Sequence, residues 1–116
     1  MPAANHDILI EQGATFRLEL AWKIDGAAVD LTGYGARMQV RGDAASESAM
    51  LSLTSSGGGG IVLGGAGGTI SVTASAAQTA ALVGRSGVYD LELESPGAEV
   101  TRLVQGHVEI SPQVTR

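Results

Sequence analysis

The sequence has no cysteine, few aromatic residues and few cations. Without cysteine, the chain cannot form a disulfide framework, a thiolate metal site or a cysteine nucleophile. Phenylalanine, tryptophan and tyrosine together make up 3% of the 116 residues, so side chains that could stack on sugar rings are scarce. Seven Lys and Arg residues stand against twelve Asp and Glu residues, which gives a formal net charge of −5. Because phosphate contacts need clustered cations, we expect no nucleic-acid partner.

Long apolar runs are also missing. No stretch approaches the roughly 18 apolar residues that span a membrane, and the N-terminal segment has no basic region followed by an apolar run. We therefore expect a soluble product with no secretory address and no membrane partner. A chain of 116 residues has room for one domain whose core needs no metal or disulfide.

The most unusual segment is the glycine-rich stretch SSGGGGIVLGGAGGT, residues 55–69. A phosphate-binding loop needs a lysine after its last glycine, but Gly68 is followed by Thr69. The glycine spacing of a dinucleotide site and the carboxylate of a calcium repeat are absent too. A linker between two domains would leave too few strands on each side of it. We predict that the glycines turn the chain around a short strand, Ile61–Leu63, and that Gly64–Gly68 connects a hairpin to the following strand.

Apolar and polar residues alternate along most of the remaining chain, as is typical of half-buried strands. In the segment 15–24 the inward positions are Phe16, Leu18, Leu20, Trp22 and Ile24, and in the segment 35–42 they are Ala36, Met38 and Val40. Counting such runs gives seven or eight strands at a spacing of roughly 8 to 12 residues. This pattern predicts an all-β fold, an Ig-like antiparallel β-sandwich. We expect one domain over residues 1–116, with residues 1–6 as an N-terminal arm and residues 112–116 as a C-terminal tail.

One alanine-rich segment, ASAAQTAALVG, departs from the strand pattern. It predicts a single short helix over about residues 76–82, with Ser75 as its N-cap and Gly84 beyond its C-terminus. A helix of this length is marginal alone, so we expect Leu82 to rest on the sandwich.

The last hairpin shows a change of parity. In its first strand the inward positions are Tyr89, Leu91 and Leu93, and a turn with Pro at its second position follows from Ser95. In the return strand Thr101 and Leu103 are inward by position, whereas Val108 and Ile110 have the opposite parity. We predict a β-bulge at Gly106. The alternative is that Val104 is the inward residue and that Leu103 is partly exposed.

Residues that could carry chemistry are few. His6 and His107 lack a third ligand at a spacing typical of zinc. Asp90, Glu92 and Glu94 could offer paired carboxylates, but their alternation is also that of a solvated sheet face. No Gly-x-Ser-x-Gly elbow is present. We therefore expect a protein that is not an enzyme and has no cofactor and no metal.

Other residues are candidates for protein contacts. Phe16 and Trp22 are expected in the core, which leaves Tyr34 as the main surface aromatic, either an interface anchor or a loop tyrosine folded over the end of the sandwich. Gly65 and Gly67 offer a surface poor in side chains, against which a neighbouring subunit could pack. Val114 and Arg116 belong to a terminus that a partner can order.

Four segments carry a resemblance to a known group. They are DILIEQGATFRLELAW, DLTGYGARMQVR, GGIVLGGAGGTISVTASAAQTAAL and GVYDLELESPGAEVTRLVQGHVEISPQVTR. Together they resemble small proteins encoded in tailed bacteriophages and prophages, and they are similar to the Ig-like domain at the N-terminus of phage baseplate upper proteins. The most specific parts are Asp30–Tyr34 with the strand after it, and the closing hairpin. The chain ends at Arg116, where a baseplate upper protein would continue, so we expect a separate virion component.

The resemblance implies a non-enzymatic virion structural protein of the tail, baseplate or fibre-attachment region, assembled in the cytoplasm of the bacterial host. It implies no catalytic residues. Its partners would be other phage virion proteins, and we expect it to form part of a symmetric homo-oligomeric assembly. A capsid decoration protein on the outer face of the head is the alternative. A carbohydrate-binding module is less favoured because it needs exposed aromatic residues.

Overall fold

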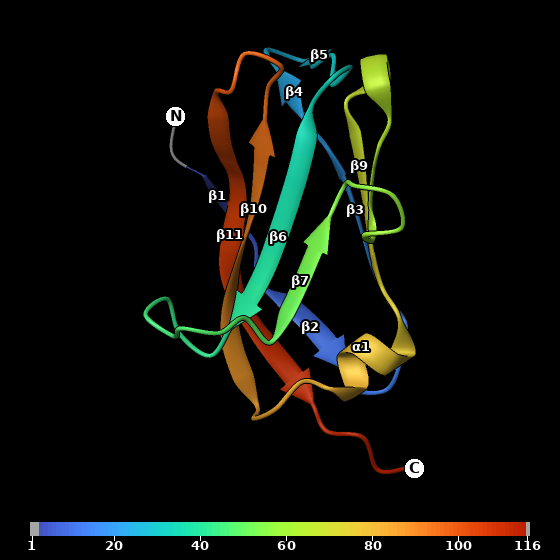
Figure 1. Cartoon of the computed structure of the whole chain (residues 1–116), viewed down its shortest axis with the longest axis vertical. Helices are drawn as coiled ribbons and strands as arrows, with labels where there is room; N and C mark the ends of the chain where they lie inside the picture. The colour runs from blue at the N-terminus through green and yellow to red at the C-terminus, as the bar shows by residue number, and fades with distance from the viewer. Residues whose placement is uncertain (1–2, 116) are drawn as a thin grey trace.

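Two β-sheets face each other across an apolar core in the computed structural model, which describes residues 3–115 (Figure 1). The larger sheet contains β1 (Ala4–Asn5), β2 (Ile8–Glu11), β6 (Gly35–Arg41), β7 (Leu51–Thr54), β10 (Ser86–Glu94) and β11 (Val100–Ser111). The smaller sheet contains β3 (Phe16–Ala21), β8 (Ile61–Leu63) and β9 (Thr69–Ala74). A short hairpin joins β4 (Lys23–Ile24) and β5 (Ala27–Ala28).

The strand order is that of an immunoglobulin sandwich. In that fold strands B, E and D form one sheet and strands C, F and G form the other. Here β3, β9 and β8 follow the order B, E, D. In the other sheet β6, β10 and β11 follow the order C, F, G, and β7 pairs with the free side of β6. Eight of the strands have three residues or more, and β1, β4 and β5 have two. The predicted Ig-like β-sandwich with seven or eight strands and one short helix is therefore confirmed.

The N-terminal segment differs from the expectation of a purely antiparallel sandwich with a free arm. Both β1 and β2 pair with β11 in parallel, with Ala4 beside Val104 and Ile8 beside Val108. The backbone N–H of His6 also donates to the carbonyl oxygen of Gln105 at 2.8 Å. Residues 4–6 of the predicted arm therefore lie against β11, and residues 1 and 2 fall outside the described residues.

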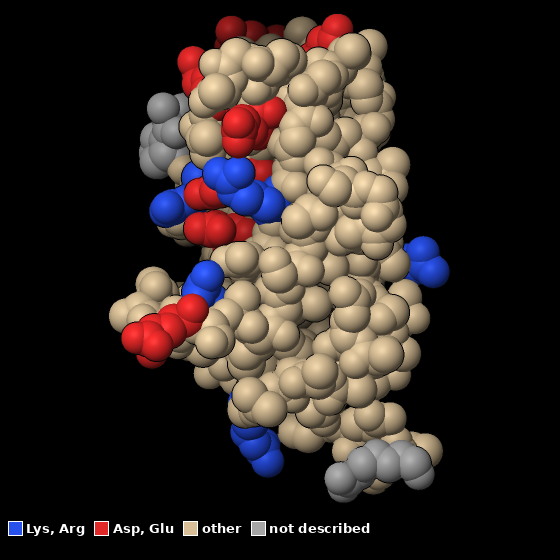
Figure 2. All heavy atoms as spheres, viewed as in Figure 1, with Lys and Arg blue, Asp and Glu red and all other residues tan. Residues whose placement is uncertain are grey.

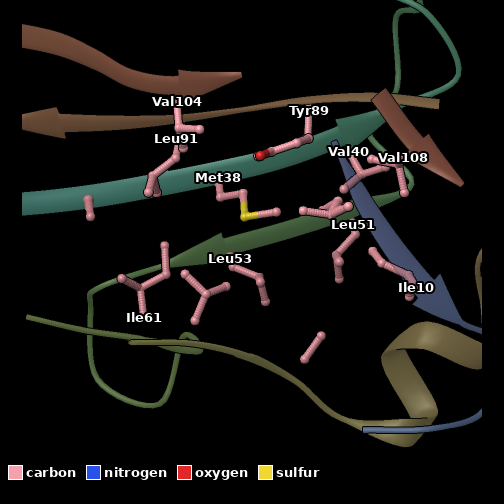
Figure 3. Packing of buried hydrophobic residues seen from close by; sticks show 14 of the residues in the cluster. Ile10, Met38, Val40, Leu51, Leu53, Ile61, Tyr89, Leu91, Val104 and Val108 are labelled. Carbon is pink, nitrogen blue, oxygen red and sulfur yellow. The ribbon is translucent and has the colours of Figure 1, made fainter. Parts of the chain in front are cut away.

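The core follows the predicted alternation. Ala36, Met38 and Val40 on β6 are buried, and so are the inward residues of β10. Figure 3 shows Met38 between Leu91 and Leu53 in the space between the two sheets. Phe16 and Trp22 are only partly buried and pack against this cluster.

The segment 15–24 is shorter as a strand than its pattern predicts. β3 ends at Ala21, and Ile24 lies in the β4–β5 hairpin. Its side chain is 52% exposed, so its predicted inward position is wrong. The reason is a tight turn, in which both Asp25 and Gly26 have positive φ angles and reverse the chain away from the core.

Helix α1 (Ala76–Ala80) confirms the predicted short helix and its cap, and it ends two residues before the predicted Leu82. The Ser75 side chain accepts from the N–H of Gln78, and the Gln78 side chain accepts from the N–H of Ser75, forming a capping box. Leu82 is 1% exposed and anchors the helix to the sandwich, as expected. Within residues 3–115, no helix is both long enough and apolar enough to cross a membrane.

The closing hairpin has its turn where predicted, but its bulge lies elsewhere. The N–H of Ala98 donates to the carbonyl of Ser95, so Pro96 holds the second position of the turn. Leu91 pairs with Val104 and Glu92 pairs with Arg102, which leaves Leu103 as the extra residue. The prediction of a bulge at Gly106 is therefore wrong. The alternative, in which Val104 is buried and Leu103 is partly exposed, is confirmed.

Gly106 has a different role. It pairs with Tyr89 in regular register. A Cβ atom at this position would collide with the carbonyl oxygen of His6. The glycine therefore allows the N-terminal segment to run close beside β11.

Candidate functional site

Three segments meet at one end of the sandwich, which we call the glycine end. They are the residue after β3 (Trp22), the loop Val29–Tyr34, and the turn Gly64–Gly68 with its 3₁₀-helix η1 (Gly65–Gly67) (Figure 1). The N–H of Leu31 donates to the carbonyl of Gly65 at 2.9 Å, and the N–H of Trp22 donates to the carbonyl of Gly68 at 2.8 Å. The turn joins the antiparallel strands β8 and β9, so the predicted hairpin around Ile61–Leu63 is confirmed.

Close backbone contacts explain why this turn is rich in glycine. Gly68 has a φ of +70°, and a Cβ atom there would lie 2.8 Å from the carbonyl oxygen of Trp22 and 3.0 Å from that of Val29. Gly67, in contrast, is exposed and has no atom within 4 Å of a Cβ position. Gly65 is half-buried beneath the loop that contains Leu31. Of the two predicted contact glycines, only Gly67 presents an open surface.

The loop Asp30–Tyr34 is held by local hydrogen bonds. One carboxylate oxygen of Asp30 accepts from the N–H of Thr32 at 3.0 Å and from its hydroxyl at 2.6 Å. These bonds, the hydroxyl bond above all, lower the pKa of Asp30 from its ordinary value. Leu31 is 2% exposed, and Gly33 has the positive φ that the following turn requires. The motif thus inserts one leucine into the core and returns the chain to β6.

Tyr34 packs at the end of this loop against Trp22. The two ring centroids are 6.2 Å apart and the planes are at 89°, an edge-to-face arrangement. Tyr34 is half-buried. This geometry corresponds to a loop tyrosine folded over the end of the sandwich, the second of the two interpretations of this residue.

The segment that follows β11 lies at the opposite end of the molecule (Figure 1). The tail begins in a fixed position because the N–H of Gln113 donates to the side chain of Gln12 at 3.0 Å. Val114 is 90% exposed, and Arg116 lies outside the described residues. The structure therefore brings Tyr34 and Gly65 to one end of the sandwich and does not bring Val114 near them.

A surface that the sequence reasoning did not single out lies on the outer face of the larger sheet. It is an open concavity of about 890 Å³ over β6, β10 and β11. We call it the charged face and define it by Arg37, Gln39, Asp90, Glu92, Arg102 and Gln105. Figure 2 shows acidic and basic side chains gathered on one side of the molecule, while the opposite side of the same view is almost uncharged.

Cross-strand ion pairs neutralise most of the charge on this face. Arg37 Nε lies 2.9 Å from Glu92 Oε1, and its Nη1 lies 3.3 Å from Glu94 Oε1. Arg102 Nε lies 3.4 Å from Asp90 Oδ2. Hydrogen bonds to Glu92 and then to Glu94 raise the pKa of Arg37 above its ordinary value. The carboxylates Asp90, Glu92 and Glu94 are thus partners of arginines. The alternation of β6, which places Arg37 on the outward side, was the sequence signal for these pairs.

Two polar contacts hold the N-terminal segment beside the charged face. The buried hydroxyl of Tyr89 donates to the backbone carbonyl of His6. Burial, and then the negative charge of Asp7, raise the pKa of Tyr89 to about 12. The backbone N–H of His107 donates to Asp7 Oδ1 at 2.9 Å. Among residues 3–115, no three His, Asp or Glu side chains form a group that could hold a metal ion.

Comparison with known proteins shows no family for this chain. No protein-family model matches the sequence, and no curated protein matches it. Among solved structures, the chain is similar to the extracellular domain of the voltage-gated sodium channel beta4 subunit, described in parallel homodimers that explain its role in cell–cell adhesion. The TM-score is 0.49 at 10% identity, over 98% of this chain and 97% of that chain. We therefore base the fold class on the strand order alone.

Proposed function

We propose that this protein is a non-enzymatic structural component of a tailed-phage virion, placed in the tail, baseplate or fibre-attachment region. The phage assignment rests on the resemblance of Asp30–Tyr34 and of the closing hairpin to the Ig-like domain of baseplate upper proteins. In this proposal the protein works by contacts with neighbouring virion proteins, after assembly in the cytoplasm of the host.

The charged face is the observation that carries the proposed protein contacts. It carries charged side chains of both signs, Arg37 and Arg102 beside Asp90 and Glu92. Its charged side chains stand on three neighbouring strands, so they keep fixed positions. Such an arrangement favours specificity through electrostatic complementarity with a protein surface. Because the face presents both arginines and carboxylates, a complementary partner would offer both signs of charge.

Copy number in purified particles tests the location. We expect a few copies to about a dozen per particle, as in closed rings of a tail or baseplate. Hundreds of copies per particle would instead support the alternative, a capsid decoration protein on the outer face of the head. Absence from particles that contain all other structural proteins would contradict both.

A charge reversal tests the contact surface. Arg37→Glu should lower the amount of protein in assembled particles, because it reverses the centre of the charged face. Arg85→Glu is the matched control, since Arg85 is exposed and lies outside this face. Equal incorporation of the two variants would show that the charged face is not the contact surface.

A carbohydrate-binding module is the candidate from another class. Tyr34 is its most suitable aromatic residue, yet the packing against Trp22 leaves it only partly exposed. Binding on a glycan array that Tyr34→Ala abolishes would favour this function over a structural one.

A further inference from the structure

Strand β3 forms an open edge of the smaller sheet. It pairs with β9 on one side, and within residues 3–115 no strand pairs with its other side. Its inward residues Phe16, Leu18 and Leu20 are only half-buried. Their partners on β9 are fully buried, at 0% exposure for Ile70, Val72 and Ala74. Within the described residues, a neighbouring strand therefore flanks the inward side chains of β3 on the β9 side only.

The backbone groups of β3 alternate between β9 and the open edge. The N–H of Trp22 donates to Gly68 in continuation of the β3–β9 register, so the even-numbered residues of β3 direct their amide groups to β9. On β9, the N–H of Thr73 donates away from β3, to Gly60, in agreement with this alternation. The amide groups of Arg17 and Glu19 therefore face the open edge, where they can pair with another strand.

The sequence of β3 is complementary to itself in one antiparallel register. When two copies of β3 pair antiparallel, inward residues must stand opposite inward residues. One residue of β3 therefore stands opposite the same residue of the second copy, and the two-fold axis passes between them. An axis at Arg17 or at Glu19 places like charges opposite each other. An axis at Leu18 places Arg17 opposite Glu19 of the second copy on the outer face, and Phe16 opposite Leu20 on the inner face.

We propose that two copies of this protein pair through their β3 edges, antiparallel about a two-fold axis at Leu18. The two smaller sheets then join into one six-stranded sheet across the dimer. Arg17 and Glu19 of each copy form two symmetric ion pairs, and the same two residues exchange about four N–H···O=C bonds. The apolar residues Phe16, Leu18 and Leu20 cover one another across the axis. This inference stands whether or not the protein belongs to a virion.

Two other edge strands, β7 and β8, are less suited to such pairing. On β7 the inward residues Leu51 and Leu53 are buried, with 5% and 0% exposure, and Thr54 is already bridged to Gly60. Strand β8 has three residues. The outer face of β3 carries one cation and one anion, and the three outward residues that face it on β9 are the uncharged Thr69, Ser71 and Thr73. Strand β9 therefore places no charge that would repel Arg17 or Glu19 of the second copy.

The strength of this dimer follows from its size. Pairing of two six-residue strands buries less than a standard protein interface, so the dimer should be weak and concentration-dependent. In a symmetric assembly, a weak contact that is repeated gains strength through multivalency.

Sedimentation equilibrium of the purified chain, up to about 1 mM, provides the main test. The wild-type chain should associate to a dimer. Arg17→Glu and Glu19→Arg should each weaken it at least 10-fold, since each places like charges across the axis. The double variant Arg17→Glu/Glu19→Arg should restore the wild-type value, and Arg85→Glu should leave it unchanged. A wild-type chain that stays monomeric, or a double variant no better than the single ones, overturns the proposal.

Cross-linking tests the position of the axis, and the absence of native cysteine makes each introduced thiol unique. Leu18→Cys should give a covalent dimer on oxidation, because the two Cα atoms at the axis would lie about 4.5 Å apart. Ala21→Cys keeps both ion pairs but places its two thiols roughly 20 Å apart, so it should not cross-link. Cross-linking of Ala21→Cys with none for Leu18→Cys overturns the proposed register.

Discussion

The hydroxyl of Tyr89 on β10 is hydrogen-bonded to the backbone carbonyl of His6, 83 residues earlier in the chain. Together with Gly106, which leaves room for that carbonyl, it fixes the N-terminal segment against β11. Tyr89→Phe should therefore cost about 1 kcal/mol of unfolding free energy at neutral pH. Hydrogen exchange at Asn5 and His6 should be faster in the variant. An unchanged exchange rate there would contradict this role of the hydroxyl.

The raised pKa of Tyr89 predicts a loss of stability at alkaline pH. An unfolded tyrosine ionises near pH 10, and burial raises the folded pKa to about 12. The stabilisation is fully present below pH 10. Between the two pKa values the unfolded state releases its proton first, so the unfolding free energy falls by at most about 1.4 kcal/mol per pH unit. Urea unfolding at several pH values should show a shallower decline for Tyr89→Phe.

Thr79 is the polar side chain buried most completely among the described residues, at 0% exposure. Its hydroxyl donates to the carbonyl of Ala14 at 2.8 Å and accepts from the N–H of Gly13 at 3.0 Å. Thr79→Val keeps the shape but leaves both backbone groups without a partner, so it should destabilise by about 1 to 3 kcal/mol. Thr79→Ser keeps the hydroxyl and should cost less. Chemical denaturation of the pair measures the difference, and equal losses would contradict it.

Two glycines of the same turn should respond in opposite ways to alanine. Gly68→Ala introduces a Cβ atom against the backbone of Trp22 and Val29 at a positive φ, and should destabilise by about 2 kcal/mol or more. Gly67→Ala meets open space at a negative φ and should change the stability by less than about 0.5 kcal/mol. Thermal unfolding of both variants is sufficient. A large loss for Gly67→Ala would show that the turn is constrained in another way.

Trp22 gives a direct signal for the glycine end because it is the only tryptophan. Tyr34→Ala removes the ring that packs edge-on against it. We expect a red shift of the fluorescence maximum and a loss of about 0.5 to 1.5 kcal/mol beyond the effect of lost apolar area. Tyr34→Phe, which keeps the ring, should retain the wild-type spectrum. A red shift in both variants would contradict the ring contact as its cause.

The parts of the fold that depend on local pattern could be predicted from the sequence. The alternation along the strand predicts the burial of Met38 and Val40, and the local sequence predicts Ser75 as the N-cap of the helix. The bulge at Leu103 could not be placed, since it depends on which residues of β10 stand opposite. Gly106 drew the prediction because glycine often marks a bulge, whereas the requirement for it comes from His6, about 100 residues away.

The same limit applies to the candidate surfaces. Each contact residue that the sequence indicates depends on a local property: an aromatic ring at Tyr34, small side chains at Gly65 and Gly67, and a terminus at Val114 and Arg116. The charged face is a product of strand register, which places Arg37 beside Glu92 only after β6 and β10 are paired. The parallel pairing of β2 with β11 likewise joins two ends of the chain, and no local pattern announces it.

The parallel pairing of β2 with β11 also determines how the molecule would bear mechanical force. Ile8 stands beside Val108 and Glu11 stands beside Ser111, so the two ends of the chain leave this pair in opposite directions along the strand axis. Tension applied between the N-terminus and the C-terminus would act in shear and stretch these hydrogen bonds together. A chain pulled by its two ends would therefore resist extension until the whole β2–β11 pair gives way at once.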